Sequence, residues 1–445
     1  MLIIALLLLT IAFIIISTAR FNLHAFLALL ISAVFFGLCS GMPLPDILSS
    51  IELGFGGTIG KIGIVIIAGA IIGCFLEKSG GAYALAELIL KVIGSKRVPY
   101  AMTLIGYVVS IPVFADSGFV ILSPLNKTLT KRAGLSLAVT ATALMLGLMV
   151  SHTLIPPTPG PIAAAGILQA DLGLVILIGL PVSLITLLFA GFWAVKIAGR
   201  VSIDPNPGLT ESDYQSRLKQ APGAFHAFLP ILAPIFLIVS KSIADYPTHP
   251  FGESGVYSLI NFIGHPIIAL SIGILFAVTL PKKFDRQMLS SSGWVGEGLL
   301  SAALIIMITG AGGAFGKVLQ QSGIGDLIGK GLSPIKFGLW LPFLIAAAIR
   351  AAQGSSTVAI ITTASILAPL LPTLGLDSDG GKTLSVLAIG AGSMVASHAN
   401  DSFFWVVTQL SGMDVKTGYR LMTAGTSCMG FFACFIIWIT GLLIL

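Results

Sequence analysis

A proline-rich segment interrupts one of the long apolar runs of the chain and limits what that run can form. Residues 151–161 read SHTLIPPTPGP, with four prolines among six consecutive positions. Proline has no N–H to donate and its ring clashes with the preceding turn, so a helix cannot continue through this segment. Within lipid the freed carbonyls need partners, so such backbone persists only where protein buries it or where it lines a wet cavity. A second polar interruption, SHANDS at 397–402, occupies a similar place in the second half.

The composition excludes a water-soluble chain. Of 445 residues, 56% are hydrophobic and 9% are charged, whereas soluble domains carry about 25% charged residues. The net charge of +6 reflects Lys and Arg in short loops, as in cytoplasmic loops of membrane proteins, and does not indicate nucleic-acid binding. The four cysteines have no metal-ligand spacing, and neither a phosphate-binding loop nor a nucleophile–base pattern occurs. We therefore predict no metal, no cofactor and no enzymatic activity.

We predict an all-α polytopic membrane protein with about ten full spans, two re-entrant hairpins and two broken helices. Each span needs about 20 mostly apolar residues. The predicted spans are 2–19, 23–41, 60–77, 172–197, 225–243, 257–280, 298–318 and 421–444, with broken helices at 135–168 and 383–410. The hairpins are 98–125 and 337–372.

The loop charges predict the orientation. Basic residues flank 98–125 on both sides, so both flanks should be cytoplasmic and the stretch should enter and leave on one side; a simple span is the alternative. The stretch 42–58 contains acidic but no basic residues and is predicted to be an external loop. The polar segment 198–224 is predicted to be a cytoplasmic linker, which places both ends of 337–372 outside.

These assignments divide the chain into two repeats of opposite orientation, residues 1–197 and 225–445. Residues 69–81, GAIIGCFLEKSGG, resemble residues 310–323, GAGGAFGKVLQQSG. In each half a hairpin, a broken helix and a closing span follow. Paired broken segments in inverted repeats are typical of secondary transporters and indicate the position of their binding site.

The hairpin tips, 112–118 and 350–356, and the two broken helices should meet near the bilayer midplane. Helix N-termini present unpaired N–H groups and partial positive charge, so they favour an anion. Neutral groups at the breaks could bind hydroxyls, although small hydroxyl residues can instead serve only helix packing. This set is Ser117, Gly118, Ser151, Thr153, Thr158, Gln353, Gly354, Ser355, Ser356, Thr357, Ser397, Asn400 and Ser402. It suits a small anionic polyhydroxy acid.

Five ionisable residues fall at membrane depth, where such residues are costly and usually functional. Asp116 and Asp401 are candidate proton carriers, because a carboxyl group in a poorly solvated site holds a proton more readily. His152 and His398 occupy equivalent places in the two halves and could titrate, bind substrate or only hold the unwound backbone. Arg350 could meet the substrate carboxylate, or it could neutralise either aspartate.

At these residues the chain resembles the gluconate permease (GntP-type) family over nearly its whole length. The most specific segments are 111–122, 151–168, 310–319, 350–360 and 397–412. The resemblance implies a multi-pass permease of the bacterial inner (plasma) membrane that brings in gluconate and related hydroxy acids with a proton. It also implies a fold with inverted repeats and a homodimeric scaffold, and by analogy alone an elevator-type movement. The family pattern often has an apolar residue at position 117 and His at position 158, where this chain has Ser and Thr.

We therefore predict a secondary active transporter that imports gluconate or a related small sugar or hydroxy acid by proton symport. Two alternatives within transport are a sodium-coupled carboxylate transporter and a D-serine-type amino-acid permease. A channel or a membrane sensor is a remote alternative, and a sensor would need a soluble output domain, for which no segment is long enough.

Overall fold

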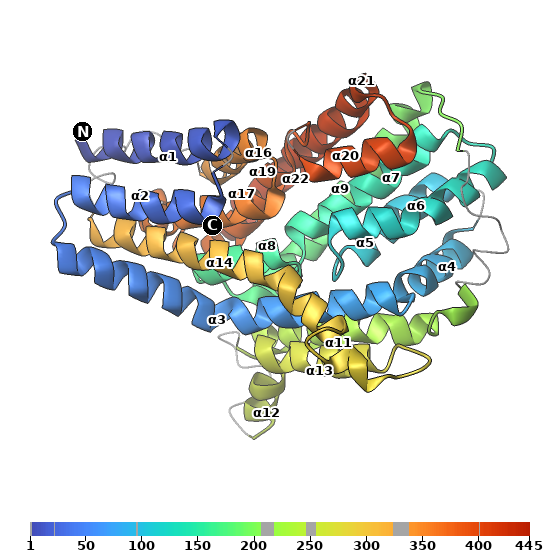
Figure 1. Cartoon of the computed structure of the whole chain (residues 1–445), viewed down its shortest axis with the longest axis horizontal. Coiled ribbons are helices and arrows are strands. Elements are labelled where there is room, and N and C mark those ends of the chain that lie inside the picture. The colour runs from blue at the N-terminus through green and yellow to red at the C-terminus, as the bar shows by residue number, and fades with distance from the viewer. Residues whose placement is uncertain are drawn as a thin grey trace.

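The computed structural model describes residues 2–21, 23–94, 97–205, 218–245, 255–323, 338–399 and 401–445, and every regular element in these ranges is helical. Most of the helices run close to the long axis of the molecule (Figure 1). The predicted all-α membrane class is confirmed. Within the described ranges seven helices are long and apolar enough to cross a membrane, or eight if the bent pair α12–α13 is one span. The total of about ten spans and the inverted repeats remain predictions.

The described residues of the first half form nine α-helices and a short 3-10 turn. They are α1 (Leu2–Arg20), α2 (Ala25–Cys39), α3 (Leu44–Lys78), α4 (Gly81–Ile93), α5 (Val98–Val109), α6 (Ala115–Arg132), α7 (Leu137–Leu154), α8 (Pro159–Leu168), α9 (Leu172–Lys196) and η2 (Ala198–Arg200). All residues of α7 are buried, so this apolar helix lies in the centre of the protein and away from lipid.

The described part of the second half contains long helices and several short helical segments. They are α11 (Ala224–Ala244), α12 (Gly255–Ile263), α13 (Pro266–Val278), η3 (Arg286–Leu289), α14 (Trp294–Gln321), α16 (Trp340–Gln353), α17 (Ser356–Leu367), η4 (Ala368–Leu370), α18 (Leu371–Leu374), α19 (Asp379–Met394), α20 (Ser402–Ser411), α21 (Val415–Gly418), η5 (Tyr419–Thr423) and α22 (Ala424–Ile444). Residues 206–217 of the predicted linker lie outside the described ranges.

The four predicted interruptions coincide with helix ends. The chain turns between α5 and α6 at 110–114 and between α16 and α17 at Gly354, whose φ of 82° requires the left-handed region. The breaks within 135–168 and 383–410 separate α7 from α8 and α19 from α20. Only two of the four prolines lie in the first break, joined by a cis peptide bond, Pro156–Pro157; Pro159 begins α8. Proline is well accommodated in a first turn, whose N–H groups have no partner within the helix.

The prediction of an external loop at 42–58 is wrong, because residues 44–58 form the beginning of α3. Pro45 and Asp46 occupy its first turn, where proline is tolerated and a carboxylate favours the helix dipole. The helix has 35 residues and is about 52 Å long at about 1.5 Å per residue. This exceeds the about 30 Å of a bilayer core, so α3 must tilt or extend beyond it.

Close packing against α14 supports this long helix. The two helices run side by side (Figure 1), and glycines lie where they approach. A Cβ added to Gly54 would lie 2.4 Å from the carbonyl oxygen of Gly313, and one added to Gly313 would lie 2.6 Å from that of Gly54. Small residues at such positions let helix backbones pack closely in membranes. Gly54 and Gly313 therefore form part of the surface along which the two helices pack.

We predict that Gly54→Ala lowers the thermal unfolding temperature in detergent, because the new methyl group must displace backbone at a cost of about 1–3 kcal/mol. Gly56→Ala is the matched control, since nothing lies within 4 Å of its added Cβ. The control should be neutral or stabilising by up to about 1 kcal/mol through helix propensity. Equal unfolding temperatures for the two variants would contradict the packing described.

Candidate functional site

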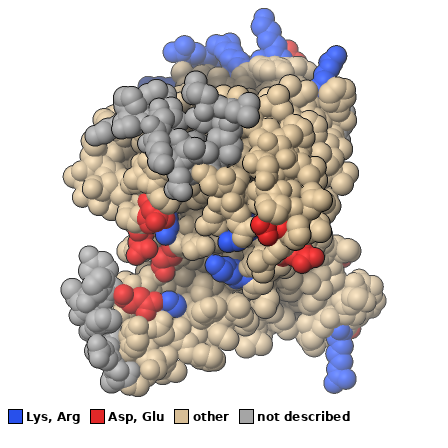
Figure 2. Space-filling model, turned by 90° about the vertical axis from the view of Figure 1, so that its left-hand side faces the viewer, with Lys and Arg blue, Asp and Glu red and all other residues tan. Residues whose placement is uncertain are grey.

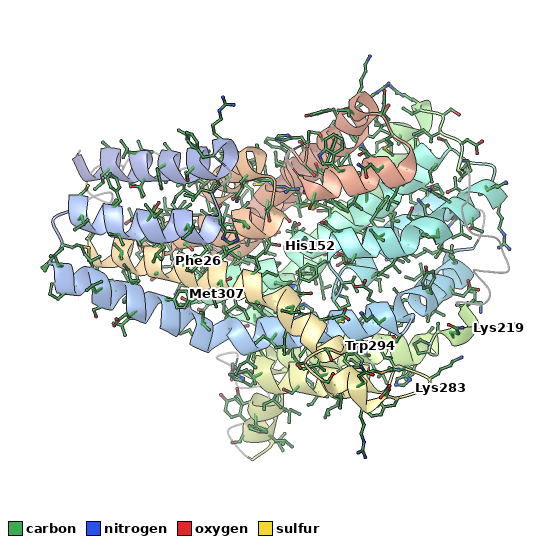
Figure 3. All side chains as sticks on the ribbon, viewed as in Figure 1. Phe26, His152, Lys219, Lys283, Trp294 and Met307 are labelled. Atoms are coloured by element: carbon green, nitrogen blue, oxygen red, sulfur yellow. The ribbon has the colours of Figure 1, made fainter. Side chains whose placement is uncertain are left out.

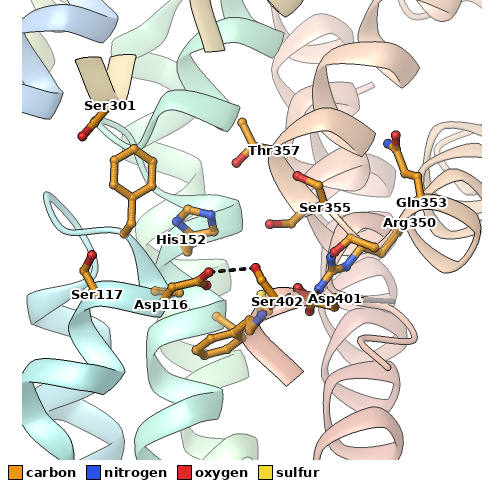
Figure 4. A pocket seen from close by; sticks show the side chains of 16 residues that line it. Asp116, Ser117, His152, Ser301, Arg350, Gln353, Ser355, Thr357, Asp401 and Ser402 are labelled. Atoms are coloured by element: carbon orange, nitrogen blue, oxygen red, sulfur yellow. Dashed lines mark hydrogen bonds and ion pairs between the residues drawn. The ribbon is translucent and has the colours of Figure 1, made fainter. Parts of the chain in front are cut away.

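A pocket of about 520 Å³ lies between the two hairpin tips, near the middle of the molecule, where His152 is labelled in Figure 3. Its lining comes from the α5–α6 and α16–α17 hairpins, α7, α14 and the beginning of α20 (Figure 4). The lining residues are Phe114, Ala115, Asp116, Ser117, Met149, His152, Ser301, Arg350, Gln353, Gly354, Ser355, Ser356, Thr357, Asp401, Ser402 and Phe403. The predicted meeting of 112–118 with 350–356 is thus observed.

Three helices begin at this pocket. The first residues of α6, α17 and α20, at Ala115, Ser356 and Ser402, all belong to its lining. The first N–H groups of a helix have no partner within it and carry partial positive charge. Side chains satisfy some of them: Ser355 accepts from the N–H of Val358 at 3.3 Å. The rest give the pocket an anion-binding character without a free cationic side chain.

Arg350 is held by an ion pair to Asp401 in one wall of the pocket. Its Nη2 lies 2.5 Å from Oδ2 of Asp401, with 1% and 5% of the two side chains exposed. Arg350 also donates to the carbonyl oxygen of Gly354 at the hairpin tip. Asp401 accepts from the hydroxyl of Ser397 and, at 3.0 Å, from the N–H of Phe403. Three partners were possible for Arg350, namely the substrate carboxylate, Asp116 and Asp401, and in the structure it pairs with Asp401.

Asp116 has a different environment on the opposite wall. Its Oδ2 accepts a hydrogen bond from the hydroxyl of Ser402 at 2.9 Å, drawn as a dashed line in Figure 4. Among the described residues no Lys, Arg or His forms an ion pair with it. The side chain is partly accessible and lines the cavity. Asp116 is thus a carboxyl group at the centre of the protein without a cationic partner in the described ranges.

The two predicted histidines differ in position. His152 lines the pocket, is 7% exposed, and its Nδ1 has no hydrogen-bond partner among the described atoms. His398 does not line the pocket; its Nε2 lies 2.8 Å from the carbonyl oxygen of Ala351, and its ring stacks on Tyr419. His152 is therefore available to contact a ligand in the pocket, whereas His398 holds the backbone at Ala351.

The other predicted residues divide in the same way. Those in the pocket lining are Ser117, Gln353, Gly354, Ser355, Ser356, Thr357 and Ser402. Those outside it are Gly118, Ser151, Thr153, Thr158 and Ser397. The hydroxyls of Ser151, Thr153 and Thr158 bond carbonyl oxygens of their own segment, those of Leu148, Met149 and Ile155. Asn400 lies outside the described residues.

Sequence reasoning missed part of the lining. Phe114, Ala115, Met149 and Phe403 are apolar or small and give no sequence signal. Ser301 comes from α14, outside every predicted break. The only sequence hint was a hydroxyl residue within an otherwise apolar span.

An all-helical membrane fold with a polar pocket between broken helices is typical of a secondary transporter. Two solved transporter structures have the same fold. MtrF of Neisseria gonorrhoeae, described within a class of antimetabolite efflux pumps, matches with a TM-score of 0.66 at 16% identity over 88% of this chain and 83% of its own. The YdaH transporter of Alcanivorax borkumensis matches with a TM-score of 0.63 at 16% identity, over 94% of this chain and 97% of its own.

Sequence comparison gives the family. The family model for GntP family permeases matches residues 1–443. A gluconate permease of Pseudomonas aeruginosa is 37% identical over 94% of this chain and 92% of its own length. The Gnt-II system L-idonate transporter of Escherichia coli is 32% identical over 93% of both chains. The D-serine transporter DsdX of the same organism is 35% identical over 94% of both chains. The chain belongs to the GntP permease family and is a multi-pass inner-membrane transporter, not an enzyme.

We predict that Arg350→Met and Asp401→Asn each strongly destabilise the protein. Either change leaves the remaining charge of the pair buried without a partner, which lowers the free energy of unfolding by about 3–5 kcal/mol. The double variant removes both charges and should recover part of the lost unfolding temperature. Thermal unfolding of the purified variants measures this coupling. Strictly additive losses in the double variant would show that the pair makes no specific contribution.

Proposed function

We propose that this permease is a secondary active transporter that imports gluconate or a related small sugar or hydroxy acid together with a proton. The observation that carries the proposal is the central pocket, where three helix N-termini converge. The one arginine among its described lining residues, Arg350, is already paired with Asp401. Its volume of about 520 Å³ falls in the usual range for small-molecule sites.

The lining favours a carboxylate that carries hydroxyl groups. The N-terminal turns of α6, α17 and α20 offer N–H groups to the carboxylate. Ser117, Ser301, Ser355, Ser356 and Thr357 supply hydroxyls for the rest of the molecule, and Gln353 has a buried side-chain amide nitrogen without a partner among the described residues. The names of the relatives support the same class of substrate, because gluconate, L-idonate and D-serine each contain a carboxylate and at least one hydroxyl group.

Asp116 is the proton carrier in this proposal. A substrate anion entering the pocket meets the Asp116 carboxylate, and the two negative charges repel each other in a poorly solvated space. Protonation of Asp116 removes that repulsion, so binding of the anion and of a proton favour each other. Asp401 is less suited to this role, because its ion pair with Arg350 stabilises the charged form.

We predict that Asp116→Asn abolishes uphill gluconate uptake driven by a pH gradient in proteoliposomes and preserves exchange of internal for external gluconate, since Asn imitates the protonated group. Ser402→Ala is the control: it removes the hydrogen bond to Asp116 and leaves the proton site, so accumulation should persist. Undiminished accumulation by Asp116→Asn would exclude Asp116 as the carrier.

A pH gradient in sodium-free buffer should drive accumulation, and a sodium gradient at equal pH on both sides should not. Competition of labelled gluconate uptake by unlabelled L-idonate, gluconate and D-serine then ranks the substrates. We expect the sugar acids to compete more strongly than D-serine, because they present more hydroxyls to the polar lining. Accumulation driven by sodium alone would favour the sodium-coupled alternative, and stronger competition by D-serine would favour the amino-acid permease.

A further inference from the structure

A second cavity of about 590 Å³ lies away from the central pocket, between α3, α14, the end of α8 and the η4–α18 segment. Three of its lining residues are lysines, Lys61, Lys317 and Lys382, and one is acidic, Asp377. Figure 2 looks onto the end of the molecule where α3 begins and α14 ends. Lys or Arg side chains lie near the middle of this face, with acidic side chains on either side.

The charges of the cavity do not cancel. Lys382 is paired with Asp377 at 3.2 Å. Lys317 contacts only the neutral amide oxygen of Gln320, at 3.1 Å, and Lys61 has no ion pair among the described residues. The ends of α8 and of the α17–α18 segment add about half a negative charge each. Lys61 and Lys317 contribute two positive charges, and the two helix ends contribute about one negative charge in total. The cavity is therefore positively charged.

Gln169 adds a neutral amide to the lining of this cavity. It lines this cavity at the end of α8 with φ 55° and ψ 38°, the left-handed conformation. Glycine is the usual residue there, because a side chain makes this conformation costly. The chain uses glycine at most of its other positive-φ positions, including Gly354 and Gly412. The end of α8 accounts for this backbone, because the N–H of Ala170 bonds the carbonyl oxygen of Ala165 at 2.8 Å and closes the helix.

The cavity is connected to the central pocket by two helices. α17 begins at the central pocket, and the η4–α18 segment that follows it lines the second cavity. α8 packs beside α17, where a Cβ on Gly160 would meet Ile360 at 2.8 Å, and its last residues line the second cavity. The path along α17 from the central pocket toward the second cavity is about 18 Å, the length of this helix of 12 residues.

We propose that this second cavity, defined by Lys61, Lys317 and Gln169, is a weak docking site that collects small organic carboxylates before they reach the central pocket. It lies on the side that the loop charges predict to be external. The identity of the carboxylate as the transported solute rests on the proposed function, whereas the anion-binding character of the cavity does not. Two lysines and a neutral amide suit a carboxylate with a neighbouring hydroxyl.

The first test needs no transport. Thr58 lines the cavity, and Thr58→Cys in a Cys39→Ser background provides a thiol there. A sulfonate-bearing methanethiosulfonate should react faster than a trimethylammonium one, and Lys61→Gln with Lys317→Gln should lower this rate ratio about tenfold. Gluconate should protect the thiol. An unchanged ratio, or no protection, would overturn the proposal.

The measurement is made in phosphatidylcholine vesicles and in vesicles that also contain an anionic phospholipid. The protection by gluconate should be present in both. If the anionic lipid blocks the thiol and gluconate does not protect it, the occupant is a lipid headgroup, and the docking of a soluble carboxylate is refuted.

The second test separates docking from fold stability through uptake kinetics. Gln169→Gly relieves the backbone conformation, so its unfolding temperature should stay the same or rise, while KM for gluconate rises several-fold and kcat stays within about twofold. Lys241→Gln, which changes an ion pair outside the cavity, should leave KM unchanged. An unaltered KM in Gln169→Gly would refute the docking role. Absence of gluconate uptake by the wild type would instead refute the proposed function and leave the reagent test intact.

Discussion

The buried ion pair between Arg350 and Asp401 holds the centre of this protein together. One guanidinium binds the carbonyl oxygen of Gly354, which the break in the hairpin leaves free, and one carboxylate caps α20. An arginine so deep in a membrane protein requires a partner, and the partner here also stabilises the second break. The pair therefore joins two interruptions of regular backbone, each of which would be costly alone. The open space of the pocket depends on that mutual support.

The positions of the four interruptions were predictable from sequence, and the physical reason is specific. Prolines at 156 and 157 remove donors, Gly354 permits a left-handed turn, and polar residues such as Asp401 are too costly in lipid unless they face protein or water. These signals are local, so a single sequence contains them. The resulting meeting of the hairpin tips in one pocket followed from the topology.

What could not be predicted depends on contacts between distant segments. The acidic residues of 42–58 indicate a loop when considered alone, and the packing of Gly54 against the backbone of α14 is not visible in the sequence. The choice of Asp401 over Asp116 as the partner of Arg350 depends on a geometry that spacing does not reveal. Ser301 entered the pocket because α14 passes beside it. The hydroxyls of Ser151 and Thr153 instead bond their own helix, as small polar residues often do in membranes.

The parallel course of α8 and α17 has an energetic consequence. Both helices begin beside the central pocket and end toward the lysine-lined cavity, so their peptide dipoles are aligned. The electrostatic potential along them rises from the carbonyl ends to the amide ends. The aligned dipoles therefore favour a negative charge at the amide ends of these helices and disfavour a positive one there. This preference comes from main-chain groups, so it depends on the two helices and not on a charged side chain.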